Sequence, residues 1–208
     1  MNRYAKPIPE FTRLEQCLVD HSKPFKLDGQ HSVFGESFDE HHYTLVLQYG
    51  TLAIQRQQDD LLMEIVAAPY IFGINAGMMG CGTEYELVTH SACSGFYLPA
   101  AAARTLIQQA GLWRDAFCWL SWHHRVMEIR DNQLVGNNSY SQIRATLLDM
   151  AQWDEGLRMR VGVMNYIQRR TRISRSVVAE VLAALWQGNY IRMERGKLVG
   201  INRLPSQY

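Results

Sequence analysis

The sequence lacks any long apolar run. No stretch approaches the roughly 18 to 20 apolar residues that a helix needs to span a bilayer, so we expect no membrane contact. The N-terminal segment Met1–Gln16 has no apolar signal core, and we therefore expect the protein to stay in the cytoplasm. Apolar residues as a class are not scarce: hydrophobic residues make up 47% and charged residues 20% of the 208 residues. This composition excludes a wholly disordered chain and allows one large or two small domains.

Catalytic and metal-binding motifs are also missing. The glycines of Gly77–Gly82 lack the Lys-Ser/Thr end of a phosphate-binding loop, and we interpret Ala76–Gly82 as an irregular loop. The adjacent pairs His41–His42 and His123–His124 point their two rings apart, unlike the His-x-His spacing of a metal-binding sandwich. No nucleophile stands in a recognisable motif with its base. We therefore expect neither an enzyme nor a bound metal or cofactor.

Cysteine is scarce, with four residues and no C-x-x-C pair. Only Cys17 lies near the N-terminus, which argues against a four-cysteine iron–sulfur cluster. Cys81 falls in the glycine-rich stretch, Cys93 at the end of a strand and Cys118 in a helix. These three are candidates for a thiol redox switch, and the alternative is that all the cysteines are reduced and structural.

Net charge is almost absent, at +1, but it is unevenly distributed. Residues 1–136 have a net charge of −5, and residues 137–208 have a net charge of +6. From residue 158 onward, 10 basic residues face only 2 acidic ones. Such an abrupt change predicts two modules, the second of which faces a polyanion.

The N-terminal part has the pattern of a β-sandwich or barrel. Short runs rich in Val, Tyr and Thr follow one another, and Gly50 between the first two is a hairpin signal. A helix is expected before them, over residues 9–21, with one face formed by Leu14, Cys17, Leu18 and His21. The expected strands are residues 42–49, 51–56, 61–66, 83–89 and 94–98.

Two helices follow the strands. The first spans residues 99–110, with Pro99 near its start and Gly111 suited to the position after its end. The second spans residues 112–130 and carries a narrow seam of a and d spacing. That seam is either a dimer interface or the face that packs on the helix's own domain. Its members are Phe117, Leu120, His124 and Met127.

The C-terminal part carries the most specific pattern. Amphipathic helices are expected over residues 140–153 and 157–169, followed by a short turn, and Ser174 then caps a helix over residues 175–187. Residues 190–201 alternate around a basic turn and predict a hairpin. Two helices, a tight turn, a third helix and a hairpin make up a winged helix-turn-helix.

This arrangement predicts binding to double-stranded DNA. The start of the third helix offers N–H groups and a positive dipole end to phosphates, and Arg175 is long enough to reach a guanine edge. Arginines crowd the turn, and Arg195 and Lys197 lie at the tip of the wing. The alternative is a basic domain that docks an acidic protein. The residues expected at DNA are Arg169, Arg170, Arg172, Ser174, Arg175, Ser176, Ala179, Glu180, Arg195 and Lys197.

The order of sandwich, long helix and winged helix resembles the CRP/FNR superfamily of bacterial transcription regulators. The family's recognition helix opens S-R-E-T-V-G-R, and the matching stretch is Ser174–Glu180. Ser176 replaces the family's Glu and Glu180 replaces its second Arg, so we expect the base preference to differ at two positions. The runs Arg172–Ser176, Gly188–Ile191 and Gly196–Val199 look closest to the subgroup called inhibitor of hydrogen peroxide resistance.

The resemblance implies an α+β fold and a function. It implies a cyclic-nucleotide-binding-like β-roll or jelly roll over residues 1–111, a connecting and dimerisation helix over 112–136 and a winged helix-turn-helix over 137–208. It further implies a homodimeric transcription regulator tied to oxidative stress, with RNA polymerase as a further partner.

The sensor pocket departs from the resemblance. Cyclic-nucleotide sensors of the family carry F-G-E and then P-R-[AS]. Here Phe72-Gly73 is followed by Ile74-Asn75, and no Arg occurs between Arg56 and Arg104. Without that cation, nothing offsets the desolvation of a buried phosphate, and we expect no binding of cyclic AMP. Two other functions stay open: a small-molecule- or metal-binding sandwich with a protein partner, and a thiol redox sensor.

Overall fold

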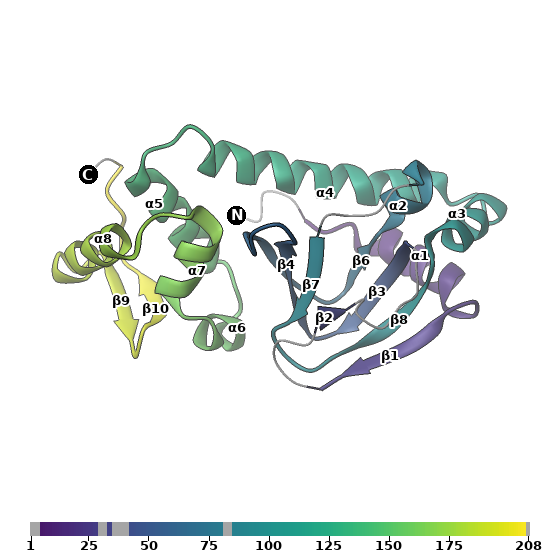
Figure 1. The fold of residues 1–208 in the computed structure, drawn as a ribbon, viewed down its shortest axis with the longest axis horizontal. Helices are drawn as coiled ribbons and strands as arrows, with labels where there is room; N and C mark the ends of the chain where they lie inside the picture. Colours follow the sequence, from purple (N-terminus) through teal and green to yellow (C-terminus); the bar gives the residue numbers. More distant parts are fainter. Residues whose placement is uncertain (1–4, 29–32, 35–41, 81–84, 207–208) are drawn as a thin grey trace. The chain divides into compact units, whose positions relative to one another are not determined.

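The computed structural model describes residues 5–28, 33–34, 42–80 and 85–206 (Figure 1). The chain has an α+β fold, with a strand-rich N-terminal part and a winged helix-turn-helix at its C-terminal end. It forms two compact units, Met1–Asp59 with Met63–Met127, and Asp60–Leu62 with Glu128–Tyr208. No helix in the described part of the chain is long and apolar enough to cross a membrane.

The N-terminal unit contains two four-stranded sheets. In one sheet the strand β8 pairs antiparallel with β1 and β3, and in the other β7 pairs antiparallel with β2 and β4. The first sheet has the order β1 (Lys23–Leu27), β8 (Cys93–Pro99), β3 (Tyr43–Tyr49) and β6 (Tyr70–Phe72). The second has the order β2 (Val33–Phe34), β7 (Tyr85–Thr89), β4 (Thr51–Arg56) and β5 (Leu62–Ala67). The expected strands are confirmed to within two residues, whereas β1, β2 and β6 were not expected.

The expected hairpin at Gly50 is wrong. β3 and β4 are consecutive in the chain but belong to different sheets, so Gly50 is a corner at which the chain changes sheet. Its φ of 98° lies in the left-handed region, and a Cβ there would stand 2.2 Å from the carbonyl oxygen of Ala92. Glycine is therefore required by the corner, and its turn-forming property alone does not reveal which strands pair.

Helices cover the first sheet. They are α1 (Ile8–Val19), α3 (Ala100–Gln109) and the start of α4 (Trp113–Leu134). Phe11, Leu14 and Leu18 bury one face of α1, whereas Cys17 is only partly buried and His21 is exposed. Trp119 of α4 is 1% exposed, and its Nε1 donates to the carbonyl oxygen of Ile71 at 3.0 Å. This hydrogen bond fixes α4 against β6.

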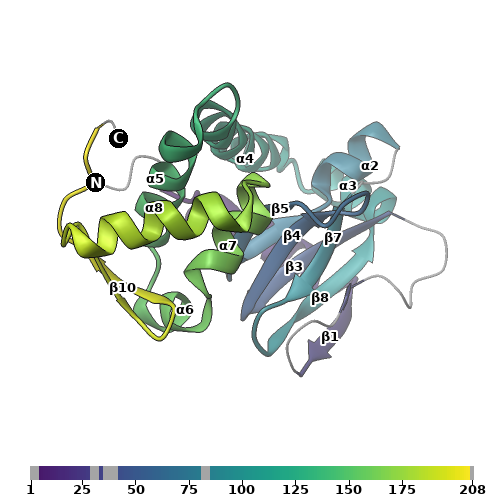
Figure 2. The same ribbon diagram turned by 60° about the vertical axis from the view of Figure 1, so that its left-hand side comes forward.

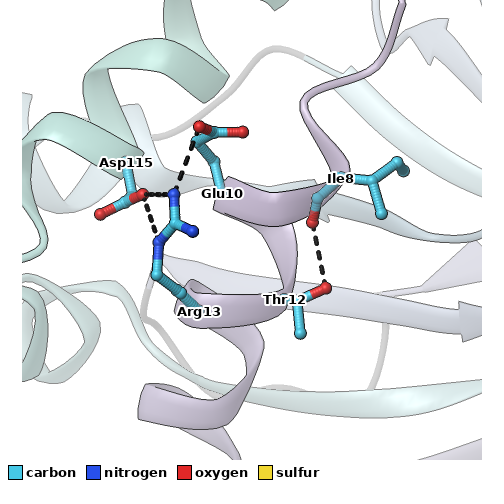
Figure 3. A network of polar contacts seen from close by, with 5 residues as sticks. All are labelled: Ile8, Glu10, Thr12, Arg13 and Asp115. Carbon is cyan, nitrogen blue, oxygen red and sulfur yellow. Dashed lines mark hydrogen bonds and ion pairs between the residues drawn. The ribbon is translucent and has the colours of Figure 1, made fainter.

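A charged contact joins α1 to α4 (Figure 3). Arg13 Nε donates to Asp115 Oδ1 at 2.8 Å, and the same guanidinium lies 3.2 Å from Glu10 Oε1. Asp115 lies in the first turn of α4, where a carboxylate is stabilised by the helix dipole. The two helices are thus joined by a polar contact at the rim as well as by their apolar faces.

We expected the glycine-rich stretch Ala76–Gly82 to be an irregular loop, but part of it is helical. Residues Ile74–Met79 form the short helix α2, bracketed by Gly73 and Gly80 in the left-handed conformation. A Cβ on Gly77 would stand 2.4 Å from the carbonyl oxygen of Ala100 at the start of α3. The glycine that suggested a loop instead lets two helices approach closely. Residues 81–84 lie outside the described residues.

Helix α4 is longer than expected. It continues four residues beyond Arg130, because Leu134 is buried and gives the last turn an apolar contact. The division between the two units falls between Met127 and Glu128, inside this helix.

The C-terminal unit is a helical core with a two-stranded wing (Figure 2). Its helices are α5 (Ser139–Met150), α6 (Glu155–Arg160), α7 (Val163–Thr171) and α8 (Arg175–Gln187), and its strands are β9 (Ile191–Glu194) and β10 (Lys197–Ile201). The wing is antiparallel, with a bulge between Leu198 and Gly200. Fully buried side chains from every part except α6 meet in this core: Ile143, Leu147, Ile167, Val178, Leu185, Ile191 and Leu198.

The single helix expected over residues 157–169 is in fact two helices. The chain is extended at Val161 and Gly162, between α6 and α7. At this break the N–H of Val163 donates to the carbonyl oxygen of Gly196, at 3.0 Å, in the wing. The tertiary bond replaces a helical one, which the helical periodicity of the sequence does not reveal.

Candidate nucleic-acid interface

The start of α8 is well defined by local chemistry. Ser174 is the N-cap, and its Oγ accepts a hydrogen bond from the N–H of Val177 at 3.4 Å. Its hydroxyl also lies 3.1 Å from that of Ser176. Arg172, with a φ of 62°, ends α7 in the left-handed conformation, and only Ile173 separates it from the cap. The turn is therefore short, and the remaining first-turn N–H groups of α8 are available to an anion.

Helix α8 has one buried and one exposed face. Val178, Val181, Leu182 and Leu185 are buried, as the sequence predicted. The four side chains expected to face DNA are all exposed: Arg175, Ser176, Ala179 and Glu180. None of these four holds the helix to its core, so this face is free to bind a ligand.

The arginines around the turn differ in exposure. Arg172 and Arg175 are exposed, and Arg169 is partly buried. Burial lowers the pKa of Arg169; the charge of Asp60 opposes this effect, and the charge of Arg172 adds to it more weakly. The Arg169 guanidinium nevertheless stays protonated near neutral pH.

Arg170 does not lie where we expected. Arg170 is only 5% exposed, and its Nη1 donates to the hydroxyl of Tyr166 at 3.0 Å. Its Nη2 lies 3.7 Å from Asp149 Oδ2, which also accepts from the Tyr166 hydroxyl at 3.1 Å. The side chain joins α7 to α5 inside the core and is not available to a phosphate. Its position in an arginine run concealed this role.

The wing tip is a tight turn at Arg195 and Gly196, both with positive φ. Arg195 is exposed. Lys197 is partly buried, and its Nζ donates to the carbonyl oxygen of Arg160 at 2.6 Å. Lys197 therefore holds the wing to the end of α6, while Arg195 presents the charge at the tip. Three further exposed cations of the charge run, Arg160, Arg192 and Arg203, were absent from the predicted set.

The expected seam of α4 is divided between two environments. Phe117 is 71% exposed and His124 is also exposed, whereas Leu120 and Met127 are partly buried. Leu120 packs against the core of the N-terminal unit, beside the buried Trp119. The helix therefore packs on its own domain with one face and leaves Phe117 for another contact.

The cysteines are not equivalent. Cys93 is buried, and its thiol donates to the carbonyl oxygens of Thr51 and Ser91. Burial raises the pKa of the Cys93 thiol and disfavours the reactive thiolate, which supports the alternative of a structural cysteine there. Cys118 is partly buried on α4, and Cys81 lies outside the described residues. Among the residues with described positions, no group of three His, Cys, Asp or Glu side chains is placed to hold a metal.

Comparison with known proteins agrees with this geometry. A family model described as winged helix-turn-helix DNA binding matches residues 139–206. The chain is 51% identical over 204 residues to the inhibitor of hydrogen peroxide resistance of Escherichia coli strain K12, with 98% of each chain covered. It is 49% identical, over the same shares, to the protein of that name from Salmonella typhimurium strain LT2.

Solved structures share the fold at low identity. The c-di-GMP responsive global regulator CLP of Xanthomonas campestris matches with a TM-score of 0.74 and 15% identity, covering 92% of this chain and 99% of that one. A Eubacterium rectale protein assigned to the crp/fnr family matches with a TM-score of 0.67 and 12% identity, covering 92% and 90%. The protein is a DNA-binding regulator of the CRP/FNR type, and it belongs to the family of the inhibitor of hydrogen peroxide resistance.

Proposed function

We propose that the protein is a homodimeric, sequence-specific transcription regulator of the hydrogen peroxide response, with a sensor domain that does not bind cyclic AMP. The observation that carries the proposal is the exposed face of α8, which begins at the Ser174 cap and has no part in the buried core. A helix with this exposure, preceded by a short turn, is the element that a helix-turn-helix places in the major groove.

Binding rests on two kinds of contact. Arg172 beside the turn and Arg195 at the wing tip are exposed cations suited to phosphates. The α8 N-terminus adds N–H groups and the positive end of the helix dipole. Phosphate contacts position the domain, whereas Arg175 and its neighbours on the exposed face read base edges. This division gives affinity and specificity to different residues.

The dimer is inferred from α4. Phe117 is one of the most exposed apolar side chains among the described residues, and Trp113 and Val135 on or beside the same helix are also exposed. A helix that packs on its own domain with one face and presents apolar side chains on another is suited to a two-fold interface. Two winged helices related by that axis would address half-sites about one DNA turn apart.

The absence of cyclic AMP binding is inferred from α2 and its flanks. Ile74, Ala76 and Gly77 of α2 are buried apolar residues, and no arginine occurs between Arg56 and Arg104. A buried phosphate there would be desolvated without a cation to offset the cost. Isothermal titration with cyclic AMP at about 1 mM should give no heat of binding, and micromolar binding would contradict this part of the proposal.

The regulatory role follows from the relatives. Proteins that are 49 to 51% identical over 98% of the chain are named for inhibition of hydrogen peroxide resistance. We therefore expect a strain that lacks this protein to survive hydrogen peroxide better than its parent, with transcript changes near the bound sites. RNA polymerase is the expected partner at those sites. Unchanged survival and unchanged transcripts would remove the peroxide role without touching the DNA-binding one.

The DNA-binding test uses the full chain and a genomic fragment pool. Affinity for enriched duplexes should fall steeply as salt rises, because phosphate contacts release counterions. Arg195→Ala should weaken enriched and random duplexes alike, and Arg175→Ala should weaken enriched duplexes more. Ser206→Ala, at an exposed position outside α8 and the wing, serves as the neutral control. A chain that enriches no fragment, or binds independently of salt, is not the regulator proposed.

A further inference from the structure

Glu180 is the one acidic residue of α8, and it lies on the exposed face. Successive residues of a helix are about 100° apart, so Arg175 and Glu180 are separated by roughly 140° around the axis. Within the first three turns of the helix the exposed residues between them on this arc are Ser176, Ala179 and Ala183, all of which are small, whereas the exposed Trp186 and Gln187 lie on the same arc farther along the axis. Arg175 and Glu180 therefore form the two edges of a face whose middle is low enough to approach the floor of a groove.

The Glu180 carboxylate has no cation to neutralise it within the described structure. It makes no hydrogen bond or ion pair to a described residue. On its own helix the residues three and four positions away are Ser176, Val177, Ala183 and Ala184, none of which is basic. Its charge is therefore free to act on whatever covers this face.

An uncompensated carboxylate on this face opposes binding to DNA in general. From residue 158 onward the chain holds only two acidic residues, and the other, Glu194, is on the wing. Glu180 repels phosphates and base acceptors, so it contributes favourably only where the DNA offers a hydrogen-bond donor. Such a residue gives specificity by penalising the wrong sequences.

Cytosine is the base that meets this requirement. In the major groove guanine shows two acceptors, thymine an acceptor and a methyl group, and adenine a donor beside the N7 acceptor. Cytosine alone shows a donor, its N4 amino group, with no acceptor on the same base. We propose that Glu180 is a specificity-determining residue that accepts a hydrogen bond from the N4 amino group of a cytosine in each half-site. This inference rests on the proposed DNA-binding function.

The position of that cytosine follows from the helix. Five residues separate Arg175 from Glu180, which is about 7.5 Å along the axis at 1.5 Å per residue. Base pairs are stacked about 3.4 Å apart. The cytosine is therefore expected roughly two to three base pairs from the guanine contacted by Arg175.

The test is selection of binding sites by the full chain from a random duplex pool, run in parallel for the wild-type protein, Glu180→Gln and Glu180→Ala. The wild-type protein should enrich one invariant cytosine per half-site, and replacing it should weaken binding about tenfold or more. Glu180→Gln should shift that position to adenine, whose N6 and N7 match an amide. Glu180→Ala should accept all four bases there within about threefold, while the remaining positions stay unchanged.

Glu194→Gln is the matched control, because it removes the same charge from an exposed residue of the wing. It should keep the cytosine and raise affinity for all duplexes alike. If both Glu180 variants retain the wild-type motif, cytosine included, the inference is overturned and the proposed function stands. If the wild-type protein enriches no motif at all, the proposed function fails and the inference fails with it.

Discussion

Individual residues in the arginine-rich stretch have opposite roles despite similar sequence surroundings. Arg170 is buried against Tyr166 and Asp149, whereas Arg172, two positions later, is exposed. The difference comes from helix phase: Arg170 lies one turn after Tyr166 on the inner face of α7, and Arg172 ends that helix with a positive φ. Charge alone cannot separate these roles, because both residues are equally basic.

This contrast gives a first prediction. Arg170→Ala should lower the free energy of unfolding by about 2 kcal/mol, because it removes a charged hydrogen bond inside the core. Arg172→Ala should leave stability within about 0.5 kcal/mol and weaken DNA binding. Urea unfolding followed by circular dichroism measures the first effect, and titration with a duplex measures the second. Equal stability of the two variants would show that Arg170 is not a core residue.

A second residue-scale prediction concerns His123 on α4. Burial, with a smaller effect of the neighbouring His124, lowers the pKa of His123, and its ring lies 6.1 Å from that of the buried Tyr70. In the unfolded chain the imidazole of His123 has a pKa of about 6.5, so it binds a proton more readily than in the folded chain. The stability contributed by the neutral ring is full above about pH 6.5 and is lost as the pH falls toward the lowered folded value.

The measurement is the urea midpoint of unfolding between pH 5 and pH 7.5. His123→Gln should flatten the acid side of this profile, because glutamine does not titrate. His124→Gln removes an exposed ring instead and should keep most of the slope. Identical slopes in the wild-type protein and His123→Gln would rule out His123 as the group responsible.

At the scale of elements, the helices and strands with a regular sequence period were predictable, whereas features that depend on tertiary contacts were not. The strands β3, β4, β5, β7 and β8, the helices α3 and α8 and the wing follow from local pattern, and so do Ser174 as a cap and the buried face of α8. The corner at Gly50, the break between α6 and α7 and the existence of α2 depend on partners distant in the sequence: Ala92, Gly196 and Ala100. The exposed face of α8, which we propose binds DNA, was therefore predictable, whereas the burial of Arg170 and the anchoring of Lys197 were not.

Helix α2 supplies the prediction at this scale. In an open helical position, Gly→Ala stabilises by up to about 1 kcal/mol. Gly77→Ala should instead destabilise by about 2 kcal/mol, because its Cβ would stand 2.4 Å from the rigid backbone oxygen of Ala100. Gly162→Ala is the control, with no atom other than Lys197 Nζ near its new Cβ, and should cost less than about 1 kcal/mol. Thermal unfolding compares the two, and a Gly77→Ala protein at least as stable as the wild type would refute the close packing of α2 on α3.

The whole molecule is a joined pair of oppositely charged modules, and its proposed activity requires two copies. Phe117→Glu should convert the dimer to a monomer, because it places a charge where an apolar ring would be covered. Affinity for a two-half-site duplex should then fall by roughly 100-fold, because the second half-site is no longer tethered to the first. Asn132→Glu adds the same charge to an exposed position elsewhere on α4 and should leave both properties unchanged. Sedimentation equilibrium gives the mass, and a wild-type protein that is already monomeric would refute the dimer.

The tryptophans give this molecule two built-in optical reporters. Trp119 is 1% exposed and hydrogen-bonded inside the N-terminal unit, so its emission should be shifted to shorter wavelength. Trp186 is 59% exposed on the same side of α8 as Arg175, and its emission should resemble that of free indole in water. Any duplex that covers α8 changes the surroundings of Trp186 and leaves those of Trp119 alone. Occupancy of the operator can therefore be followed by fluorescence in the unlabelled protein, with the loss of the signal in Trp186→Phe identifying its source.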